Sequence, residues 1–156
     1  MRTVRRRDDR GATAVEFALV SVPFFILVFG IIAFGVIFAQ DLALGNGARE
    51  AARYSVVGSR TCGQIESAAQ DASNGIAMSG SAVKVTVKVG QSLATATQKC
   101  SSATAADDAV VPCAGSAAGD SAFVVLDFNS SLIIPLVVVK NSFAISGNGV
   151  FRCEFS

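Results

Sequence analysis

The hydrophobic positions of this chain begin with one long uninterrupted run. Residues 17–39 are 23 residues without a charged side chain. As an α-helix this run is about 34 Å long, enough to cross the hydrocarbon core of a bilayer, which is about 30 Å thick. A buried helix of a water-soluble protein is rarely apolar on every side. The pattern therefore predicts a transmembrane helix.

The helical pattern continues beyond the apolar run. Residues 41–57 are rich in alanine and keep apolar side chains at helical spacing. Gly45-Asn46-Gly47 is a weak point at which this helix could hinge or break. Gly58 is suited to cap the C-terminal end, because glycine adopts the left-handed conformation easily. If it is unbroken, the helix over residues 12–57 is a rod of about 69 Å.

Shorter elements are predicted after Gly58. Residues 61–64, Thr-Cys-Gly-Gln, form a capping box that opens a short helix with apolar positions as far as Ile76. Residues 83–89 alternate strictly between valine and polar side chains, which is typical of a half-buried strand. Residues 92–120 are rich in small side chains and predict a long loop.

More strands are predicted towards the C-terminus. Residues 122–128 read as a second strand, whereas residues 132–139 contain Pro135 and predict an edge segment or a loop. Residues 142–146 and 150–155 read as two strands joined by a hairpin turn at Gly147-Asn148-Gly149. The expected fold is α+β, with a long N-terminal helix and an antiparallel sheet of roughly three to five strands packed on its outer half.

The charge distribution orients the predicted membrane span. Residues 1–10 carry five arginines and two aspartates. Positively charged flanks stay in the cytoplasm, so we expect the N-terminus inside and the rest of the chain outside. A secretory signal peptide would have an apolar core of only about 7–15 residues. We expect a cytoplasmic basic leader over residues 1–11, the long helix over residues 12–57 and an extracytoplasmic α+β head over residues 58–156.

All four cysteines lie beyond the apolar run, at Cys62, Cys100, Cys113 and Cys153. No two of them form the Cys-x-x-Cys pair of a zinc or redox motif. An even number on one side of a membrane predicts two disulfides in an oxidising space, and the alternative is four buried free thiols. Of the three possible pairings we favour Cys100–Cys113 as a loop staple and Cys62–Cys153 as a clasp between the start of the head and its last strand.

The composition gives little support to an enzyme. The chain has no histidine, which removes the commonest general base and the commonest zinc ligand, and it has no Gly-x-Ser-x-Gly elbow. Asp107 and Asp108 point in different directions and have no third ligand nearby in the sequence. Lys84 and Lys88 read as solvated lysines on one strand face. With a net charge of +1, the chain is expected to have no catalytic residue, metal site, cofactor or nucleic-acid partner.

One acidic residue, Glu16, stands at the edge of the apolar run, where a carboxylate is costly. Gly11 precedes it by five positions and Phe17 follows it. This Gly-x-x-x-x-Glu-Phe arrangement resembles the prepilin processing site of Flp-type type IV pilins. Residues 10–20 and 48–54 resemble the TadE-like minor pilins, or pseudopilins, of the tight-adherence pilus system. Residues 149–154 are similar to the tail of TadE-like proteins from actinobacteria.

The resemblance implies a type IV pilin-like fold and cleavage between Gly11 and Ala12 by a membrane-embedded prepilin peptidase. The new amine on Ala12 would be largely cationic near neutral pH, because its reference pKa is about 7.7–8.0. The resemblance implies that this amine pairs with Glu16 of a neighbouring subunit, which lowers the cost of each charge at the membrane. The residues implied in processing are Gly11, Ala12, Glu16 and Phe17, and those in subunit pairing are Ala12 and Glu16.

The partners implied by the resemblance are the cytoplasmic membrane, other pilin or pseudopilin subunits, the pilus assembly machinery and the peptidase. Two alternatives stay open from the residues themselves. Glu16 could be hydrated at the membrane edge beside Arg10, without a partner subunit. The chain could also be an uncleaved single-pass anchor whose outer domain binds a ligand.

Overall fold

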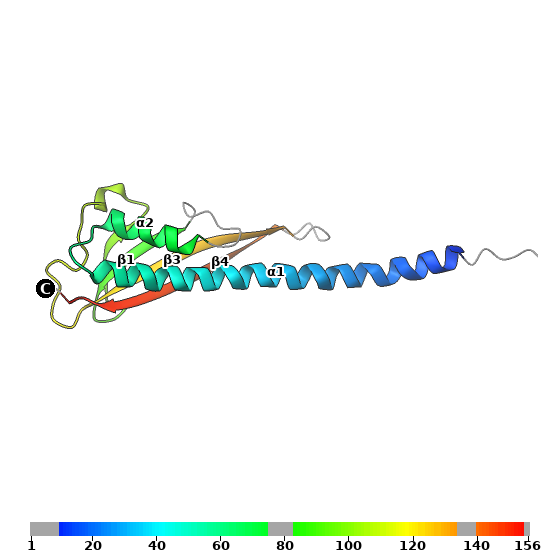
Figure 1. Ribbon diagram of the computed structural model, residues 1–156, viewed down its shortest axis with the longest axis horizontal. Helices are drawn as coiled ribbons and strands as arrows, with labels where there is room; N and C mark the ends of the chain where they lie inside the picture. The colour runs from blue at the N-terminus through cyan, green and yellow to red at the C-terminus, as the bar shows by residue number, and fades with distance from the viewer. Residues whose placement is uncertain (1–9, 75–82, 134–139, 155–156) are drawn as a thin grey trace, which may run out of the picture.

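The computed structural model describes residues 10–74, 83–133 and 140–154. These ranges contain two α-helices, a short 3-10 helix and four strands: α1 (Arg10–Val56), α2 (Cys62–Ser73), β1 (Lys84–Gly90), β2 (Thr97–Ser101), η2 (Ala105–Asp107), β3 (Ser121–Ile133) and β4 (Lys140–Arg152). The strands form one antiparallel sheet in the order β2-β1-β3-β4. Figure 1 shows α1 extending far beyond this sheet as a rod. The predicted α+β, pilin-like layout is confirmed.

The long helix is continuous. α1 has 47 residues and is therefore about 70 Å long. It does not break at Gly45-Asn46-Gly47. Gly47 instead allows α2 and β3 to pack closely against the helix. A Cβ added to Gly47 would lie 2.9 Å from the Cβ of Ser73 on α2 and 3.2 Å from Leu126 on β3. Gly58 follows the helix with a φ of 55°, as predicted for a C-terminal cap.

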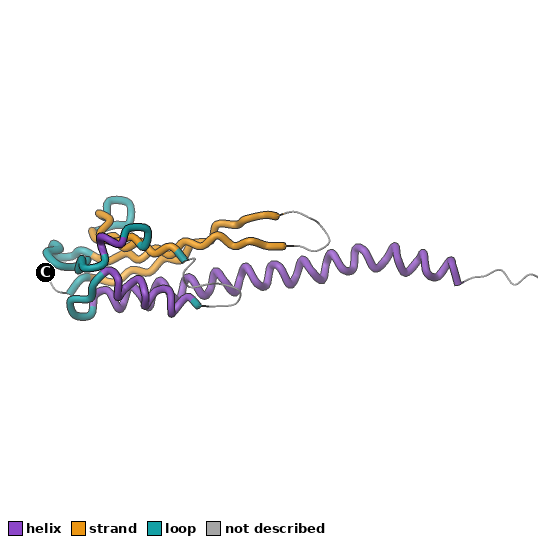
Figure 2. The backbone as a smooth tube through the Cα atoms, turned by 90° about the horizontal axis from the view of Figure 1, so that it is seen from above, coloured by secondary structure: helices purple, strands orange, loops and turns teal. Residues whose placement is uncertain are grey.

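The core of the head lies between the helices and one face of the sheet (Figures 1 and 2). The alternation in β1 directs its valines to that face, opposite apolar partners on β3: Val85 pairs with Leu126, and Val87 with Val124. These side chains pack on the outer half of α1, where four residues are fully buried: Leu44, Ala48, Ala51 and Ala52. The outer half of α1 is therefore part of the core of the head.

The last strand corrects one prediction. β4 is a single strand of 13 residues that keeps an unbroken register with β3 from Ser121↔Arg152 to Ile133↔Lys140. A Cβ added to Gly147 would overlap the backbone of Leu44, and one added to Gly149 would overlap the backbone of Ala48. The predicted hairpin turn at residues 147–149 is wrong, because these glycines let the α1 backbone approach the sheet closely.

The remaining elements agree with the sequence to different degrees. α2 begins with the predicted capping box, in which the Thr61 N–H donates to Gln64 Oε1 at 3.3 Å. The valine strand is present as β1. The predicted loop over residues 92–120 is wrong in part, because it contains β2 and η2. Ile76 and Pro135 lie outside the described residues.

Candidate functional site

The N-terminal half of α1 is the first candidate site. Within Gly11–Val56, a window of 18 residues is apolar enough for a membrane span, and none of that window is buried. Its large side chains are open, as at Phe17, which is 73% exposed. Contiguous apolar surface of this size is unusual on a soluble monomer. This half of α1 could therefore span a membrane, in agreement with the sequence.

The predicted processing residues lie together at the beginning of this exposed half. Gly11, Ala12, Glu16 and Phe17 are all helical and all exposed. A Cβ added to Gly11 would meet nothing within 4 Å. Ala12 and Glu16 are four residues apart, so they lie one above the other on the same side of the helix. Within the described ranges the side chain of Glu16 makes no ion pair or hydrogen bond, and it is open to an external partner.

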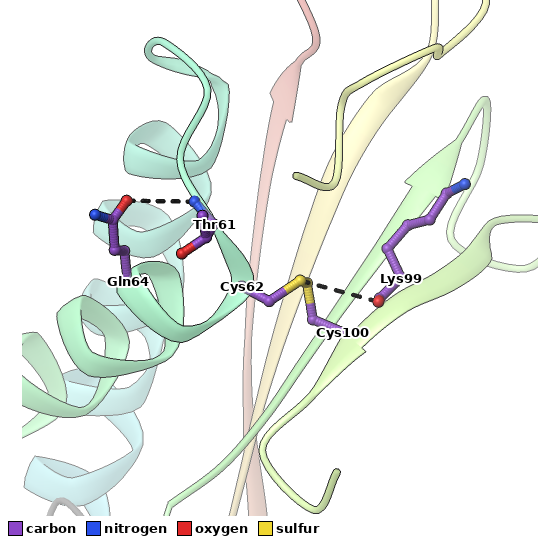
Figure 3. Close-up of a disulfide and its surroundings, with 5 residues drawn as sticks. All are labelled: Thr61, Cys62, Gln64, Lys99 and Cys100. Carbon is purple, nitrogen blue, oxygen red and sulfur yellow. Dashed lines mark hydrogen bonds between the residues drawn. A yellow bond between two sulfur atoms is a disulfide. The ribbon is translucent and has the colours of Figure 1, made fainter. Parts of the chain in front are cut away.

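Two disulfides brace the head. Cys62, the first residue of α2, is joined to Cys100 on β2, and Cys113 in the following loop is joined to Cys153 just beyond β4. The Cα atoms are 5.7 Å apart in both pairs. Figure 3 shows the first disulfide, with Cys62 Sγ 3.9 Å from the Lys99 carbonyl oxygen. The predicted number of disulfides is confirmed, but the favoured pairing, Cys62–Cys153 with Cys100–Cys113, is wrong.

The sheet order explains the observed pairing. The start of α2 lies beside the chain that follows β2, because the Cys62 N–H donates to the Val110 carbonyl at 2.8 Å. The Cys153 N–H donates to the Asp120 carbonyl at 2.9 Å, which brings Cys153 to the beginning of β3. These contacts place Cys62 near Cys100, and Cys153 near Cys113. The sequence could not predict this, because it did not reveal β2.

A small acidic cluster lies at the exposed side of α2. Burial raises the pKa of Glu66 above its ordinary value, and repulsion by Asp108 and Asp107 raises it further. Asp107 ends η2, and Asp108 is exposed, close to the expected solvated turn. Among the described residues, no group of three or more metal-ligating side chains is placed to hold an ion. The cluster therefore affects the pKa of Glu66.

The outer face of the sheet carries an apolar hollow that the sequence did not reveal. Its volume is about 230 Å³, and it is lined by Leu93 and by residues of β3 and β4: Phe123, Val124, Val125, Asn148, Gly149 and Val150. Pockets for drug-sized ligands hold about 300–1,000 Å³, so this hollow suits a side chain rather than a whole small molecule. It went unpredicted because Leu93 fell in the expected loop and β4 was divided in two.

The comparisons with known proteins concern α1. Residues 11–53 match the family model described as TadE-like protein. The match includes both the exposed and the buried half of the helix and ends before α2. No curated protein and no solved structure matches the chain. The resemblance noted at residues 10–20 and 48–54 falls within the matched segment except for Arg10 and Tyr54. The long helix α1 is therefore similar to the TadE-like family, which is consistent with a protein of the tight-adherence (Tad/Flp) pilus system.

Proposed function

We propose that this protein is a membrane-anchored, minor pilin-like structural subunit for the assembly of tight-adherence pili, with its N-terminus in the cytoplasm and its head outside. The observation that supports this most is the N-terminal half of α1. It is an exposed apolar helix whose one acid before Asp41 is Glu16, one turn after Ala12. The role is structural rather than catalytic, consistent with a chain that lacks histidine.

Processing would hydrolyse the peptide bond between Gly11 and Ala12. Water adds across this bond, leaving a carboxylate on Gly11 and an amine on Ala12. Gly11 lies in the first turn of α1, where the N–H groups have no partner within the helix and the backbone opens most easily. The space around Gly11 is open, and glycine offers a protease no side chain to obstruct its backbone.

Pairing between subunits would follow from this cleavage. The free amine of Ala12 carries a positive charge near neutral pH, and Glu16 of a neighbouring helix supplies the negative charge. Both charges are costly at the edge of hydrocarbon, so two helices that bring them together lower that cost. The exposure of Ala12 and Glu16 on one side of α1 leaves room for such a neighbour.

The test of processing is the intact mass of the membrane-extracted protein from cells with and without a prepilin peptidase. We expect the loss of residues 1–11 only when the peptidase is present. Gly11→Leu should prevent this loss, whereas the matched control Gly30→Leu should not, since Gly30 also has open space around it but lies far from the cleavage site. A full-length chain in every sample would contradict the proposal.

The test of pairing is co-purification of other pilin subunits with Glu16→Gln. This variant keeps the size of the side chain, so we expect membrane insertion to be normal and partner capture to be lost. Asp41→Asn is the control, because Asp41 is an exposed acid of the same helix outside the apolar run. Equal capture by Glu16→Gln and the unmodified chain would argue against charge pairing.

The second candidate function is an uncleaved single-pass anchor whose head binds a ligand. The apolar hollow beside Leu93 and Val150 favours it, because such a surface could receive a side chain of another molecule. This candidate predicts that Val150→Asp abolishes ligand capture by whole cells while Glu16→Gln leaves it unchanged. The pilin proposal predicts instead that Glu16→Gln impairs pilus assembly more strongly than Val150→Asp does.

A further inference from the structure

The two edges of the sheet differ in how well they are protected against pairing with another chain. β2 has only five residues, includes Lys99, and its register with β1 shifts once. Short edge strands, lysine and irregular register are common ways of preventing such pairing. β4 has 13 residues in unbroken register with β3, and it carries no charged residue or proline between Asn141 and Phe151. The β4 edge is therefore the one suited to receive a strand.

The backbone of β4 presents a row of unpaired groups along this edge. The Cys153 N–H donates to the Asp120 carbonyl, and this pair continues the register of β3 and β4. Bonded pairs alternate in an antiparallel ladder, so even-numbered residues of β4 direct their N–H and C=O groups away from β3. Among the described residues, no backbone hydrogen bond connects these groups to another segment, and Figure 1 shows β4 at the border of the sheet. Another extended backbone is the natural partner for such a row.

The apolar hollow lies beside the same edge. Asn148 and Val150 line it together with Phe123 and Leu93. In an antiparallel strand added to β4, the residues opposite Asn148 and Val150 would direct their side chains to this same face of the sheet. One large apolar side chain of the added strand would then reach the hollow. Backbone pairing for affinity and a side-chain pocket for specificity are the two components of recognition by strand addition.

Helix α1 restricts the other face of an added strand. A Cβ added to Gly147 or Gly149 would overlap the α1 backbone, so the helix lies directly over β4. A helix with its side chains is about 10–12 Å wide, whereas neighbouring strands are about 4.8 Å apart. α1 therefore extends over the position of the added strand. The side chains of that strand on the α1 face must be small.

A second copy of this chain does not fit as the symmetric partner. Two copies joined by their β4 edges around a two-fold axis would pair these strands antiparallel. β4 runs in the same direction as α1, since Gly147 lies against Leu44 and Gly149 against Ala48. The two α1 helices would then point in opposite directions and could not both be anchored with their N-termini in one cytoplasm. This step rests on the membrane anchoring in the proposed function.

We propose that the free edge of β4 and the apolar hollow form a docking site for an extended segment of a different protein outside the membrane. The segment extends the four-stranded sheet beyond β4. It places one large apolar side chain in the hollow beside Val150 and small side chains under α1.

The first test is amide hydrogen exchange, followed by NMR on the full chain in detergent. The probe is a strand, Thr-Ala-Phe-Ala-Val-Ala-Thr, fused after Ser156 through a flexible Gly-Ser linker. Tethering gives the probe an effective concentration of about 1 mM or more. A matched control probe has aspartate in place of its phenylalanine. Peptide mapping without reduction shows whether both native disulfides are retained in each fusion protein.

In the unmodified chain, we expect the N–H groups of Ala144, Ser146 and Asn148 to exchange much faster than those of Ile145 and Gly147, which bond to β3. The phenylalanine probe should slow exchange at the first three positions by about tenfold or more, and leave the other two nearly unchanged. The aspartate probe should have little effect, because a charged side chain is costly in an apolar hollow.

The second test identifies the natural partner by photo-cross-linking in cells that make the pilus. A photoactivatable phenylalanine derivative replaces Asn148, which is exposed at the edge. We expect a cross-link to an apolar residue within an extended segment of a different protein. Ser146→Pro should abolish this cross-link without unfolding the head, because the N–H of Ser146 points away from β3 and proline is tolerated at such positions.

Several outcomes would overturn the proposal. Slow exchange at Ala144, Ser146 and Asn148 in the unmodified chain would show that the edge is already paired. Equal slowing by the phenylalanine and aspartate probes would remove the hollow from recognition, and no slowing by either would remove the edge. No cross-link, or a cross-link to a second copy of the chain, would contradict the choice of partner. Exchange in detergent does not depend on anchoring, which alkali extraction of membranes tests separately.

Discussion

The two halves of α1 are one helix with the same backbone hydrogen bonding but opposite surroundings. In residues 11–39 no side chain is classed as buried. From Gln40, which is 3% exposed, the helix enters the head, and Leu44 is fully buried. The exposed half carries large side chains such as Phe and Ile on all sides. The residues of the other half that are buried in the head are mostly small, as at Gly47, Ala48 and Ala51.

This difference shows how a single helix can serve two solvents. Small residues let α2 and the sheet approach the outer half, as Gly47 does towards α2. Large residues on the other half leave apolar surface that only lipid or another helix can cover. The stability of the head should therefore depend on the outer half, and membrane insertion on the inner half. Mutations placed in matched pairs at buried and exposed positions of α1 test this division.

The largest effect is expected from Gly149→Val. A side chain at this position overlaps the backbone of Ala48, which cannot move without displacing α1, so we expect a loss of about 3 kcal/mol or more and failure of the head to fold. The matched change is Gly30→Val, since nothing lies within 4 Å of Gly30. Urea unfolding of the full chain in detergent, followed by the fluorescence of the single tyrosine, Tyr54, measures both. Similar unfolding curves for the two variants would break the comparison.

A smaller effect is expected from Leu44→Ala, compared with Leu42→Ala. Leu44 is fully buried in the core, and its truncation should lower the free energy of unfolding by about 2–5 kcal/mol. Leu42 is 52% exposed two positions earlier, so its truncation should cost well under 1 kcal/mol. The same unfolding assay compares them. Equal losses in the free energy of unfolding would show that the stability of the head does not depend on which side of α1 faces the core.

The sequence predicted the parts of this fold that depend on local pattern. The uncharged run of residues 17–39 marks the exposed half of α1, and the alternating valines mark β1. The capping box at Thr61 predicted where α2 begins, since it involves only neighbours in the chain. The candidate site residues Gly11 and Glu16 came from a resemblance to a short family motif, and their roles in processing and pairing stay predictions.

The wrong predictions concern residues whose structure is decided by contacts with distant parts of the chain. Gly147 and Gly149 look like a turn by themselves, but they are strand residues kept small by the α1 backbone, about a hundred positions earlier in the chain. The polar strand β2 has no apolar alternation, so Cys100 was placed in a loop. Without β2, the Cys62–Cys100 pairing had no geometric basis. Tertiary contacts, not local pattern, decide such positions.

The two disulfides should contribute to the outer region alone. Each closes a loop of similar length, 38 and 40 residues apart, so a chain-entropy argument gives nearly equal contributions, about 2–4 kcal/mol each. We expect Cys62→Ala with Cys100→Ala, and Cys113→Ala with Cys153→Ala, to destabilise the head to a similar extent. Alkali extraction of membranes should show unchanged insertion for both. A loss of insertion would mean that the head and the exposed half are not independent.

The smallest effect concerns Glu66, whose pKa is raised in the folded head by burial and by Asp108 and Asp107. A raised carboxyl pKa means that the folded state binds the proton more tightly than the unfolded state, so the ionised side chain is destabilising above the folded pKa. Stability attributable to Glu66 should therefore increase as the pH falls through that pKa, and level off below the ordinary value of about 4.3.

Glu66→Gln should stabilise the head at pH 7 by less than about 1 kcal/mol, because the site is partly solvated. This gain should vanish near pH 4. Unfolding curves at the two pH values measure this, and an equal change at both would assign the effect of Glu66 to packing instead of charge.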